Sequence, residues 1–358
     1  MDGMSNLRAA VIGYGLAGEV FHAPLLAATP GLEVAAIVSA NAERAARARA
    51  AHPGAEVVAR ADDVWARADA LDLVVVAAPN AAHVPLARAA IDHGLAVVVD
   101  KPLAIDAAAA RGLVDHAERA GTLLTVFHNR RWDADQRTLR RLLAEGRLGE
   151  PLRYEARFER WRPRPADAWR RSADPATGGG ELLDLGSHLV DQAVQLFGPV
   201  ATVAAELSAT EPGVPEDTIF LSLLHRGGMR SHLWASSRCP APGARMRVLG
   251  SEAAFVVEHE DRQEAALKAG RRPGGEEPWG VVPESAWGRV VVGDASEPVP
   301  SELGHWDAFY TGLAAALRDG APPPVDPHDA VAVLDVLGAA RVSAAEGRAV
   351  RVGDPARG

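Results

Sequence analysis

Two residues that could exchange a proton, Asp184 and His188, stand four positions apart after three consecutive glycines. On a helix this spacing puts both side chains on one face. A histidine titrates near neutral pH, and a neighbouring carboxylate can raise its basicity and fix its orientation. The pair could therefore take the proton of an alcohol during hydride transfer. The same spacing also fits a structural surface pair, or a buried histidine whose hydrogen bonds are satisfied.

A third reactive group, Lys101, lies in Asp100-Lys101-Pro102, directly after the apolar run Ala96–Val99. If this run is a strand of a parallel sheet, its carboxyl end borders the ligand site. An ammonium group there can hold or polarise a substrate oxygen. The alternative is an ordinary solvated lysine before a loop proline.

A glycine-rich turn follows the first apolar run, Leu7–Ile12. Each glycine has a mechanical role: Gly13 allows the tight turn, Gly15 lets the backbone approach a pyrophosphate, and Gly18 lets a helix pack closely on the strand. The pyrophosphate would rest on the positive N-terminus of that helix. We assign to cofactor binding the whole turn: Gly13, Tyr14, Gly15, Leu16, Ala17 and Gly18.

The end of the second apolar run predicts a preference for NADP over NAD. An NAD-selective site places an acid about 20 residues beyond the glycine turn. Here Val38 is followed by Ser39, Ala40 and Asn41, with no acid before Glu43 and with Arg44 one turn into the next helix. A 2'-phosphate would meet Ser39 and Arg44 without carboxylate repulsion.

Apolar runs and amphipathic stretches alternate through the first third of the chain, which predicts a doubly wound parallel sheet, a Rossmann domain over residues 1–126. The predicted strands are Leu7–Ile12, Leu32–Val38, Glu56–Ala59, Leu71–Val76, Ala96–Val99 and Thr122–Val126. The predicted helices are Ala42–Ala51, Ala61–Ala68, His83–His93 and Ile105–Ala120, besides the one that follows Gly18.

The remainder, residues 127–358, predicts an α+β domain with a mostly antiparallel, open-faced sheet, because its strands follow one another without crossover helices. Its predicted strands are Leu152–Phe158, Val200–Leu207, Ile219–Leu224, Ser231–Ala235, Met246–Leu249 and Ala254–Val257. Its predicted helices are Asp135–Glu145, Glu181–Leu196, Leu303–Leu317 and Pro327–Ala345. The stretch Arg262–Pro300 is rich in Gly, Pro and charge, which predicts an irregular excursion.

Further polar residues follow predicted strands. Asn80 could meet the cofactor, and Trp132, in Asn129-Arg130-Arg131-Trp132, could form an apolar wall of the substrate pocket, although such loop residues are also common without a function. An arginine-rich run favours an anionic substrate, a salt-bridged strand face or a subunit interface. It comprises Arg153, Arg157, Arg160, Arg162, Arg164, Arg170 and Arg171, against the acids Glu155, Glu159 and Asp167.

The overall composition is that expected of a cytoplasmic enzyme. The formal net charge of -9 argues against a nucleic-acid partner. A single cysteine, Cys239, fits a reducing compartment, and no signal segment or apolar run of about 18 residues indicates secretion or a membrane. No cluster has zinc-site spacing, so we expect no metal. Apolar positions in Val200–Leu207 and Ile219–Leu224 suggest a sheet covered on both faces, by helices and by a second subunit, and hence a homodimer or homotetramer.

Together these motifs resemble the glucose-fructose oxidoreductase, inositol dehydrogenase and MocA (Gfo/Idh/MocA) family of NAD(P)-dependent oxidoreductases. The resemblance covers almost the whole chain. It rests on Val11 to Gly18 with Phe21-His22-Ala23-Pro24, Ala78-Pro79-Asn80 with His83, Asp100-Lys101-Pro102, Gly180 to His188, and Phe309 to Val325. The family pattern at the lysine is usually Glu-Lys-Pro, and here Asp100 replaces the Glu.

This resemblance implies that Lys101, Asp184 and His188 form the catalytic group and that the open-faced sheet is an oligomer interface. Around them we assign further contacts: Pro79, Asn80, His83 and Lys101 to the cofactor, and Asn129, Arg131 and Trp132 to the substrate. Gly15 to Pro24 and Asn129 to Trp132 look most like the branch with scyllo-inositol dehydrogenases, so we expect a cyclitol or sugar as substrate.

The function predicted is reversible hydride transfer between NADP or NAD and a secondary hydroxyl of a polyol. His188 would remove the hydroxyl proton, Asp184 would orient His188, and Lys101 would support the charge that develops on oxygen. Oxidation should then increase with pH as His188 loses its proton. Two alternatives are a glycosidase that oxidises its substrate only transiently and a regulator that binds the dinucleotide without turnover.

Overall fold

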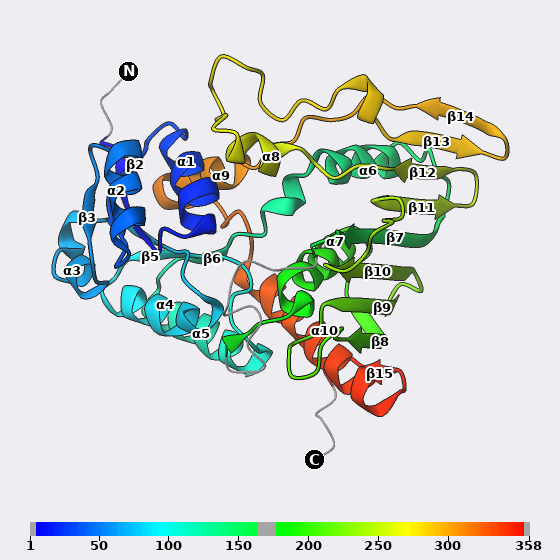
Figure 1. Ribbon diagram of the computed structural model, residues 1–358, viewed down its shortest axis with the longest axis horizontal. Coiled ribbons are helices and arrows are strands. Elements are labelled where there is room, and N and C mark those ends of the chain that lie inside the picture. The colour runs from blue at the N-terminus through cyan, green and yellow to red at the C-terminus, as the bar shows by residue number, and fades with distance from the viewer. Residues whose placement is uncertain (1–4, 163–176, 354–358) are drawn as a thin grey trace.

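The structure, a computed structural model, describes residues 5–162 and 177–353 and has one sheet in each half of the chain (Figure 1). The N-terminal sheet has six parallel strands in the order β3-β2-β1-β4-β5-β6. They are β1 (Leu7–Ile12), β2 (Leu32–Val38), β3 (Glu56–Val58), β4 (Leu73–Val76), β5 (Ala96–Val99) and β6 (Leu124–Val126). The predicted doubly wound domain is confirmed, with strand ends within two residues of those expected.

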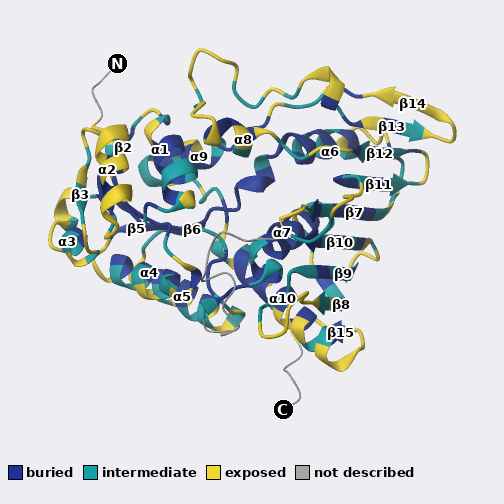
Figure 2. Ribbon diagram, in the orientation of Figure 1, coloured by how far each residue is buried: buried dark blue, intermediate teal, exposed yellow. Residues whose placement is uncertain are grey.

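Helices cover both faces of this sheet, α1 and α2 on one side and α4 and α5 on the other (Figure 1). Every residue of β4 and β5 is buried, as the unbroken apolar runs predict for strands covered twice (Figure 2). The α-helices are α1 (Ala23–Ala27), α2 (Ala42–Ala51), α3 (Asp62–Trp65), α4 (His83–Asp92) and α5 (Ala107–Ala120). Short helices are the π-helix η1 (Ala17–His22) and the 3-10 helices η2 (Ala68–Ala70), η3 (Asn80–Ala82) and η4 (Asn129–Trp132).

The second sheet has nine strands in the order β14-β13-β12-β11-β7-β10-β9-β8-β15. Among its described strands β7 and β10 pair in parallel and the other neighbours are antiparallel, which confirms the mostly antiparallel prediction. The strands are β7 (Pro151–Glu159), β8 (Val200–Ser208), β9 (Thr218–His225), β10 (Arg230–Ser236), β11 (Met246–Gly250), β12 (Ala254–Val257), β13 (Arg289–Val292), β14 (Ala295–Pro298) and β15 (Val350–Arg351).

Helices of the second half cover one face of this sheet and also reach back to the first domain. Tyr310 on α9 contacts His22 of the N-terminal domain, so a helix from near the end of the chain packs beside its first helices (Figure 1). The helices are α6 (Ala134–Ala144), the π-helix η7 (Leu182–Gly186), α7 (Ser187–Phe197), α8 (Gln263–Lys268), the 3-10 helix η8 (Glu284–Ala286), α9 (Ala308–Asp319) and α10 (Pro327–Glu346).

The prediction that Arg262–Pro300 is irregular was wrong. Helix α8 occupies its start, and strands β13 and β14 form a hairpin near its end. The β-branched run Val290–Val292 extends the sheet beside β12, and Gly293, with a φ of 57°, makes the turn. The composition of the segment hid these elements because the strands are only four residues long.

The face of the second sheet away from the helices carries half-buried aromatic and charged side chains. The rings of Phe220 and Trp234 lie 5.0 Å apart, and the Arg157 guanidinium lies 3.8 Å from the Trp234 ring centroid. On the same face, Glu155 of β7 pairs with Arg153 of the same strand at 2.9 Å and with Arg247 of the neighbouring strand β11 at 3.0 Å. Part of the arginine-rich run therefore forms a salt-bridged strand face, whereas Arg164, Arg170, Arg171 and Asp167 lie outside the described residues.

Candidate active site

The glycine turn between β1 and η1 has the shape that a dinucleotide needs. Gly13 has a φ of 102°, and a Cβ there would overlap the carbonyl oxygen of Ala77. A Cβ on Gly18 would overlap the carbonyl oxygen of Gly13. A Cβ on Gly15, in contrast, would meet only the Arg44 guanidinium at 3.8 Å, so this backbone faces open space. The turn therefore fits a pyrophosphate at Gly15.

The residues predicted to set cofactor preference lie beside this turn. Asn41 caps α2 by accepting a hydrogen bond from the Arg44 amide at 2.9 Å, which leaves the Arg44 guanidinium near Gly15. Ser39, at the end of β2, donates to the Asn41 carbonyl oxygen over 3.4 Å. Between Ser39 and Arg44 the only acidic residue is Glu43, whose side chain is exposed on α2.

The other residues assigned to the cofactor have structural contacts. The loop after β4 begins at Ala77 and includes Pro79 and Asn80. Asn80 donates a hydrogen bond to the carbonyl oxygen of Gly178 at 2.8 Å and so joins this loop to the second domain. His83 is fully buried, and its two ring nitrogens contact the carbonyl oxygens of Pro102 at 2.8 Å and Ala78 at 2.9 Å. His83 thereby ties the loop after β4 to the loop that carries Lys101. Tyr14 is buried with its ring 6.2 Å from that of His52, whereas Leu16 is exposed and lines the cleft between the domains together with Ala17.

Lys101 projects into this cleft from the carboxyl end of β5. Its Nζ donates to the main-chain carbonyl oxygen of Asp184 at 2.7 Å and also contacts the Asp184 carboxylate. The preceding residue, Asp100, accepts a hydrogen bond from the Lys101 amide at 2.9 Å and lies 3.5 Å from the buried His22. Burial would raise the pKa of Asp100, but the contact with His22 and the charges of His22 and Lys101 lower it. Asp100 is therefore held as a carboxylate at the base of Lys101.

His188, from the first turn of α7, lines the same cleft as Lys101 and Asp184. The structure thus brings together all three residues of the predicted catalytic group. The π-helix η7, which carries Asp184, immediately precedes α7; π-turns of this kind are frequent at functional sites. The Gly180 that leads into η7 has a φ of 98°, which allows the chain to turn into the cleft.

The relation between Asp184 and His188 differs from that expected. Asp184 contacts Lys101, and the His188 Nδ1 is buried without a hydrogen-bond partner among the described residues. Burial lowers the pKa of His188 well below its ordinary value, and the charges of Lys101, Arg130 and His128 lower it further. His188 is therefore neutral, and ready to accept a proton, at neutral pH. The expectation that a carboxylate raises its basicity is not met.

Several cleft residues were absent from the predicted set. Arg130, Arg160, Arg162, Glu264 and Lys268 all line the cleft. Three of them did leave a signal in the sequence: Arg130 stands inside Asn129–Trp132, and Arg160 and Arg162 belong to the arginine-rich run. Glu264 and Lys268 lie on α8, inside the segment predicted to be irregular.

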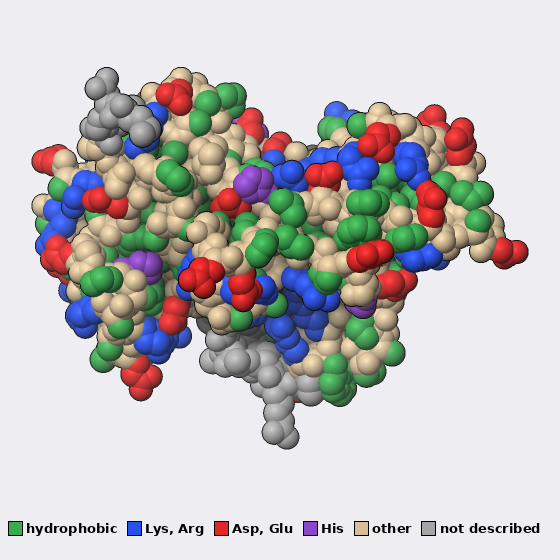
Figure 3. Space-filling view, turned by 90° about the horizontal axis from the view of Figure 1, so that it is seen from above, with side chains coloured by type: hydrophobic (Ala, Val, Ile, Leu, Met, Phe, Trp, Pro, Cys, Tyr) green, Lys and Arg blue, Asp and Glu red, His purple; other side chains and the backbone are tan. Residues whose placement is uncertain are grey.

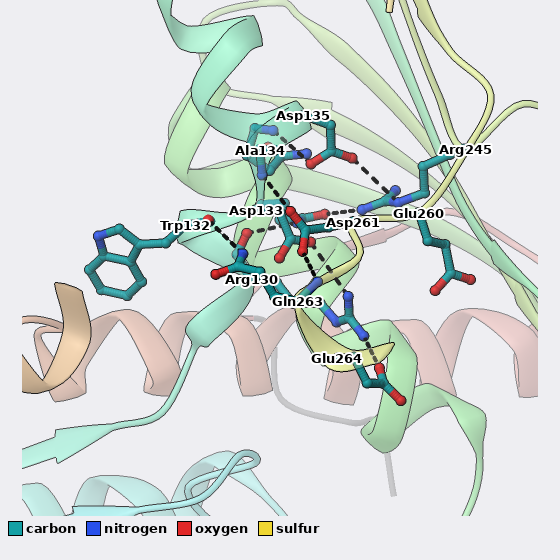
Figure 4. Close-up of polar contacts among 12 residues, drawn as sticks. Arg130, Trp132, Asp133, Ala134, Asp135, Arg245, Glu260, Asp261, Gln263 and Glu264 are labelled. Atoms are coloured by element: carbon teal, nitrogen blue, oxygen red, sulfur yellow. Dashed lines mark hydrogen bonds and ion pairs between the residues drawn. The ribbon is translucent and has the colours of Figure 1, made fainter. Parts of the chain in front are cut away.

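Arg130 is held in a buried polar cluster (Figure 4). Its guanidinium donates to Glu264 at 2.9 Å and lies 3.5 Å from Asp133. It also lies 4.6 Å from the ring centroid of Phe158. Asp133 in turn accepts a hydrogen bond from the Trp306 indole at 2.8 Å. Burial raises the pKa of Asp133 well above its ordinary value despite the Arg130 charge.

The residues assigned to the substrate on η4 are separated by the fold. Asn129 lines the cleft. The Arg131 guanidinium instead donates to Asp191 and, at 3.0 Å, to Asp329, so it joins η4 to α7 and α10. The Trp132 indole packs 6.1 Å from the ring of Phe309 and points away from the Arg130 cluster in Figure 4.

Two kinds of feature were also sought among residues 5–162 and 177–353. No group of three or more His, Cys, Asp or Glu side chains there has an arrangement that could hold a metal ion. None of the helices in these ranges has the length and hydropathy required to cross a membrane.

Comparison with known proteins places this geometry among oxidoreductases. Residues 7–128 match the model of an oxidoreductase family with an NAD-binding Rossmann fold, and residues 136–256 match that of the GFO/IDH/MocA C-terminal domain. The chain is 37% identical to the Escherichia coli oxidoreductase YdgJ, over 93% of this chain and 94% of that protein. It is 33% identical to the Bacillus subtilis scyllo-inositol 2-dehydrogenase (NADP(+)) IolW, over 97% and 96%. Among solved structures, the Bacillus subtilis oxidoreductase yvaA superimposes with a TM-score of 0.90 at 32% identity, over 98% of this chain and 99% of that chain.

Proposed function

Because this chain belongs to the Gfo/Idh/MocA family of NAD(P)-dependent oxidoreductases and is a dehydrogenase acting on CH-OH groups, we propose that it oxidises a secondary hydroxyl of a cyclitol or sugar, with NADP as the preferred cofactor. The reverse reaction would reduce the corresponding ketone. The name of the relative IolW, an NADP-dependent inositol dehydrogenase, supports both the substrate class and the cofactor.

One observation carries this proposal: Lys101, Asp184 and His188 line one cleft although they come from different domains. Lys101 stands at the carboxyl end of a parallel strand, where ligands of such sheets bind. A substrate in the cleft would therefore meet a neutral histidine and an ammonium group next to the cofactor domain. This set can move a proton and stabilise an oxyanion without a metal.

The mechanism assigns a separate role to each side chain. The neutral His188 accepts the proton of the reacting hydroxyl, which its lowered pKa permits at neutral pH. The Lys101 ammonium donates to the same oxygen and stabilises the negative charge that develops on it. Asp184 holds Lys101 in position through two contacts. When bound, the nicotinamide supplies the carbon that accepts the hydride.

Residues of the first domain would hold that cofactor. The open backbone at Gly15 would receive the pyrophosphate, and the Arg44 guanidinium, next to Gly15, would pair with a 2'-phosphate. Ser39 would contribute a hydroxyl on the same side. At the end of β2 this chain has Ser39 in place of the acid typical of NAD-selective sites, which favours NADP over NAD.

We also propose that the protein is a homodimer or homotetramer in the cytoplasm. The aromatic face around Phe220 and Trp234 lies opposite the helices and is only half buried, which suits a second subunit. One cysteine, Cys239, fits a reducing compartment.

A cofactor-linked substrate screen tests the proposal. The purified protein is incubated with NADP, or with NAD, and a panel of cyclitols and sugars, and the absorbance of the reduced nicotinamide is followed. Continuous reduction with NADP and a polyol supports the proposed reaction. Release of a glycoside's leaving group without net reduction would instead establish the transient-oxidation alternative, and binding without either would indicate a regulator.

A further inference from the structure

The wall of the cleft that the second domain contributes is strongly basic. Arg130, Arg160, Arg162 and Lys268 line it, and they come from η4, the segment after β7, and α8. Figure 3 shows Lys and Arg side chains gathered near the boundary between the two domains. A neutral polyol would need few of these charges.

Acidic partners only partly neutralise this wall. Glu264 is shared by three cations: it accepts from Arg130 at 2.9 Å and Lys268 at 2.5 Å, and it lies 3.9 Å from Arg160. Burial would raise the pKa of Glu264, but the charges of Arg130, Arg160 and Lys268 lower it to about 2. Glu260 pairs with Arg160 through both of its oxygens.

The fourth cation, Arg162, adds a charge that no acid among residues 5–162 and 177–353 pairs with. Its amide donates to the Ser237 carbonyl oxygen at 2.7 Å, which fixes the backbone, while its exposed side chain has no ion pair with the described residues. Among its described residues, the second domain's wall thus holds four cations against the carboxylates Glu260, Glu264 and Asp184, and Asp184 pairs with Lys101 of the first domain. The further acid near Arg130, Asp133, has a pKa raised by burial and so carries less negative charge.

The lowered pKa of His188 reflects its burial and the positive charges that surround it in the cleft. Its pKa is lowered by burial and then by the charges of Lys101 and Arg130, with Arg160 contributing in the same direction. A positive potential at the reacting centre would attract an anionic ligand and increase its local concentration.

From these contacts we propose that the substrate is a polyol that carries an anionic group, a carboxylate or a phosphate, which the basic wall at Arg162 and Lys268 binds while the reacting hydroxyl meets Lys101 and His188. The inference rests on the proposed dehydrogenase function and restricts its substrates, cyclitols or sugars, to those that carry a carboxylate or a phosphate. Guanidinium groups match the geometry of both anions and can bind them through two parallel hydrogen bonds.

Matched sets of substrates test the inference. Glucose, glucuronate and glucose 6-phosphate are compared, as are myo-inositol and its monophosphate, by kcat/KM with NADP and by calorimetric binding to the protein–NADP complex. We expect an acidic member to exceed its neutral partner by about tenfold or more at low salt, with the advantage falling at high salt, because exposed charges are screened. The acidic member with the highest kcat/KM shows whether the site prefers a carboxylate or a phosphate.

The outcomes separate this inference from the proposed function. Oxidation of neutral members as efficiently as acidic ones would overturn the anionic substrate and leave the dehydrogenase function standing. Selective binding of acidic members without turnover would support the anionic site and contradict the proposed reaction. Binding of no member of either set would overturn the anionic site.

A variant pair localises the effect. Arg162→Gln should raise KM for the acidic substrate roughly five- to tenfold, as expected for the loss of one charged contact, and leave the neutral partner unchanged. Arg226→Gln, which makes the same charge change in the exposed turn between β9 and β10, should change neither. An equal effect of Arg162→Gln on both substrates, with an unchanged unfolding midpoint, would contradict the assignment.

Discussion

The Lys101 Nζ lies 2.7 Å from the main-chain carbonyl oxygen of Asp184 and also contacts that residue's carboxylate, so one ion pair joins the two domains across the cleft. The Lys101 side chain is 14% exposed, and that of Asp184 is 33% exposed. This geometry supports a role for Asp184 in positioning the lysine, whereas the spacing in the sequence had suggested that it orients His188.

Substitution of Lys101 should impair both turnover and substrate binding, because in the proposed mechanism its ammonium contacts the reacting oxygen in the ground state and the transition state. Lys101→Ala should therefore lower kcat and raise KM, and Lys101→Arg should not restore activity, since a planar guanidinium cannot replace a compact ammonium group. Steady-state kinetics with saturating NADP measure both constants. Near-normal kcat/KM in Lys101→Arg would contradict a role at the reacting oxygen.

A double-mutant cycle tests which partner Asp184 serves. Because Asp184 contacts Lys101, the effects of Asp184→Ala and Lys101→Ala on kcat/KM should be strongly non-additive, with a coupling of roughly 0.5–3 kcal/mol. The cycle of Asp184→Ala with His188→Ala should show the smaller coupling. The opposite order would restore the orienting role that the helical spacing suggested.

The pH dependence of oxidation should reflect the lowered pKa of His188. A base acts in its deprotonated form, and burial together with Lys101 and Arg130 lowers this pKa below 6.5, so kcat/KM should fall only on the acid side of that value. Glu181 is another group that titrates near Asp184, since burial and the Asp184 charge raise its pKa to about 7. Any inflection near pH 7 should disappear in Glu181→Gln. A midpoint at or above 7 that persists in this variant would show that His188 titrates higher than its surroundings imply.

Cofactor preference should depend on Arg44. Loss of a charged contact with the 2'-phosphate in Arg44→Ala should raise KM for NADP about tenfold and leave KM for NAD unchanged. Arg47→Ala is the matched control, because Arg47 lies on the same helix but pairs with Glu19 at 2.6 Å. Ser39→Asp should shift preference toward NAD. Higher efficiency of the wild type with NAD than with NADP would refute the preference.

Assembly should depend on the aromatic face of the second sheet. Trp234→Glu places a carboxylate between Phe220 and Arg157 and should release monomers, if this face binds a second subunit. Leu303→Glu makes the same kind of change at an exposed loop residue and should leave the assembly intact. Light scattering at micromolar concentration measures the mass, and a monomeric wild type would overturn the prediction.

The sequence predicted the N-terminal domain closely because its features are local. Continuous apolar runs such as Leu73–Val76 mark strands covered on both faces, and Gly18 is needed where it approaches the Gly13 carbonyl oxygen within one turn. Motif and spacing alone left the roles of Lys101 and His188 open, and the resemblance to the family assigned both to the catalytic group.

Tertiary contacts account for what the sequence did not reveal. The Lys101–Asp184 pair spans 83 positions, and the Arg130–Glu264 contact spans 134, so no local pattern could indicate either. The π-helix η7 and the hairpin β13–β14 are short elements that only packing against neighbours stabilises. For Arg131, the ion pairs with Asp191 and Asp329 show a connecting role that its position beside the cleft residues did not suggest.

The most direct test of the account is the turnover of His188→Ala, measured with NADP and the best polyol substrate alongside NADP binding. If His188 is the general base, turnover should fall roughly 10²- to 10⁴-fold while the dissociation constant for NADP stays unchanged, because the glycine turn lies in the other domain. Near wild-type turnover with the same pH profile would show that His188 is a buried structural histidine, and the proposed mechanism would fail.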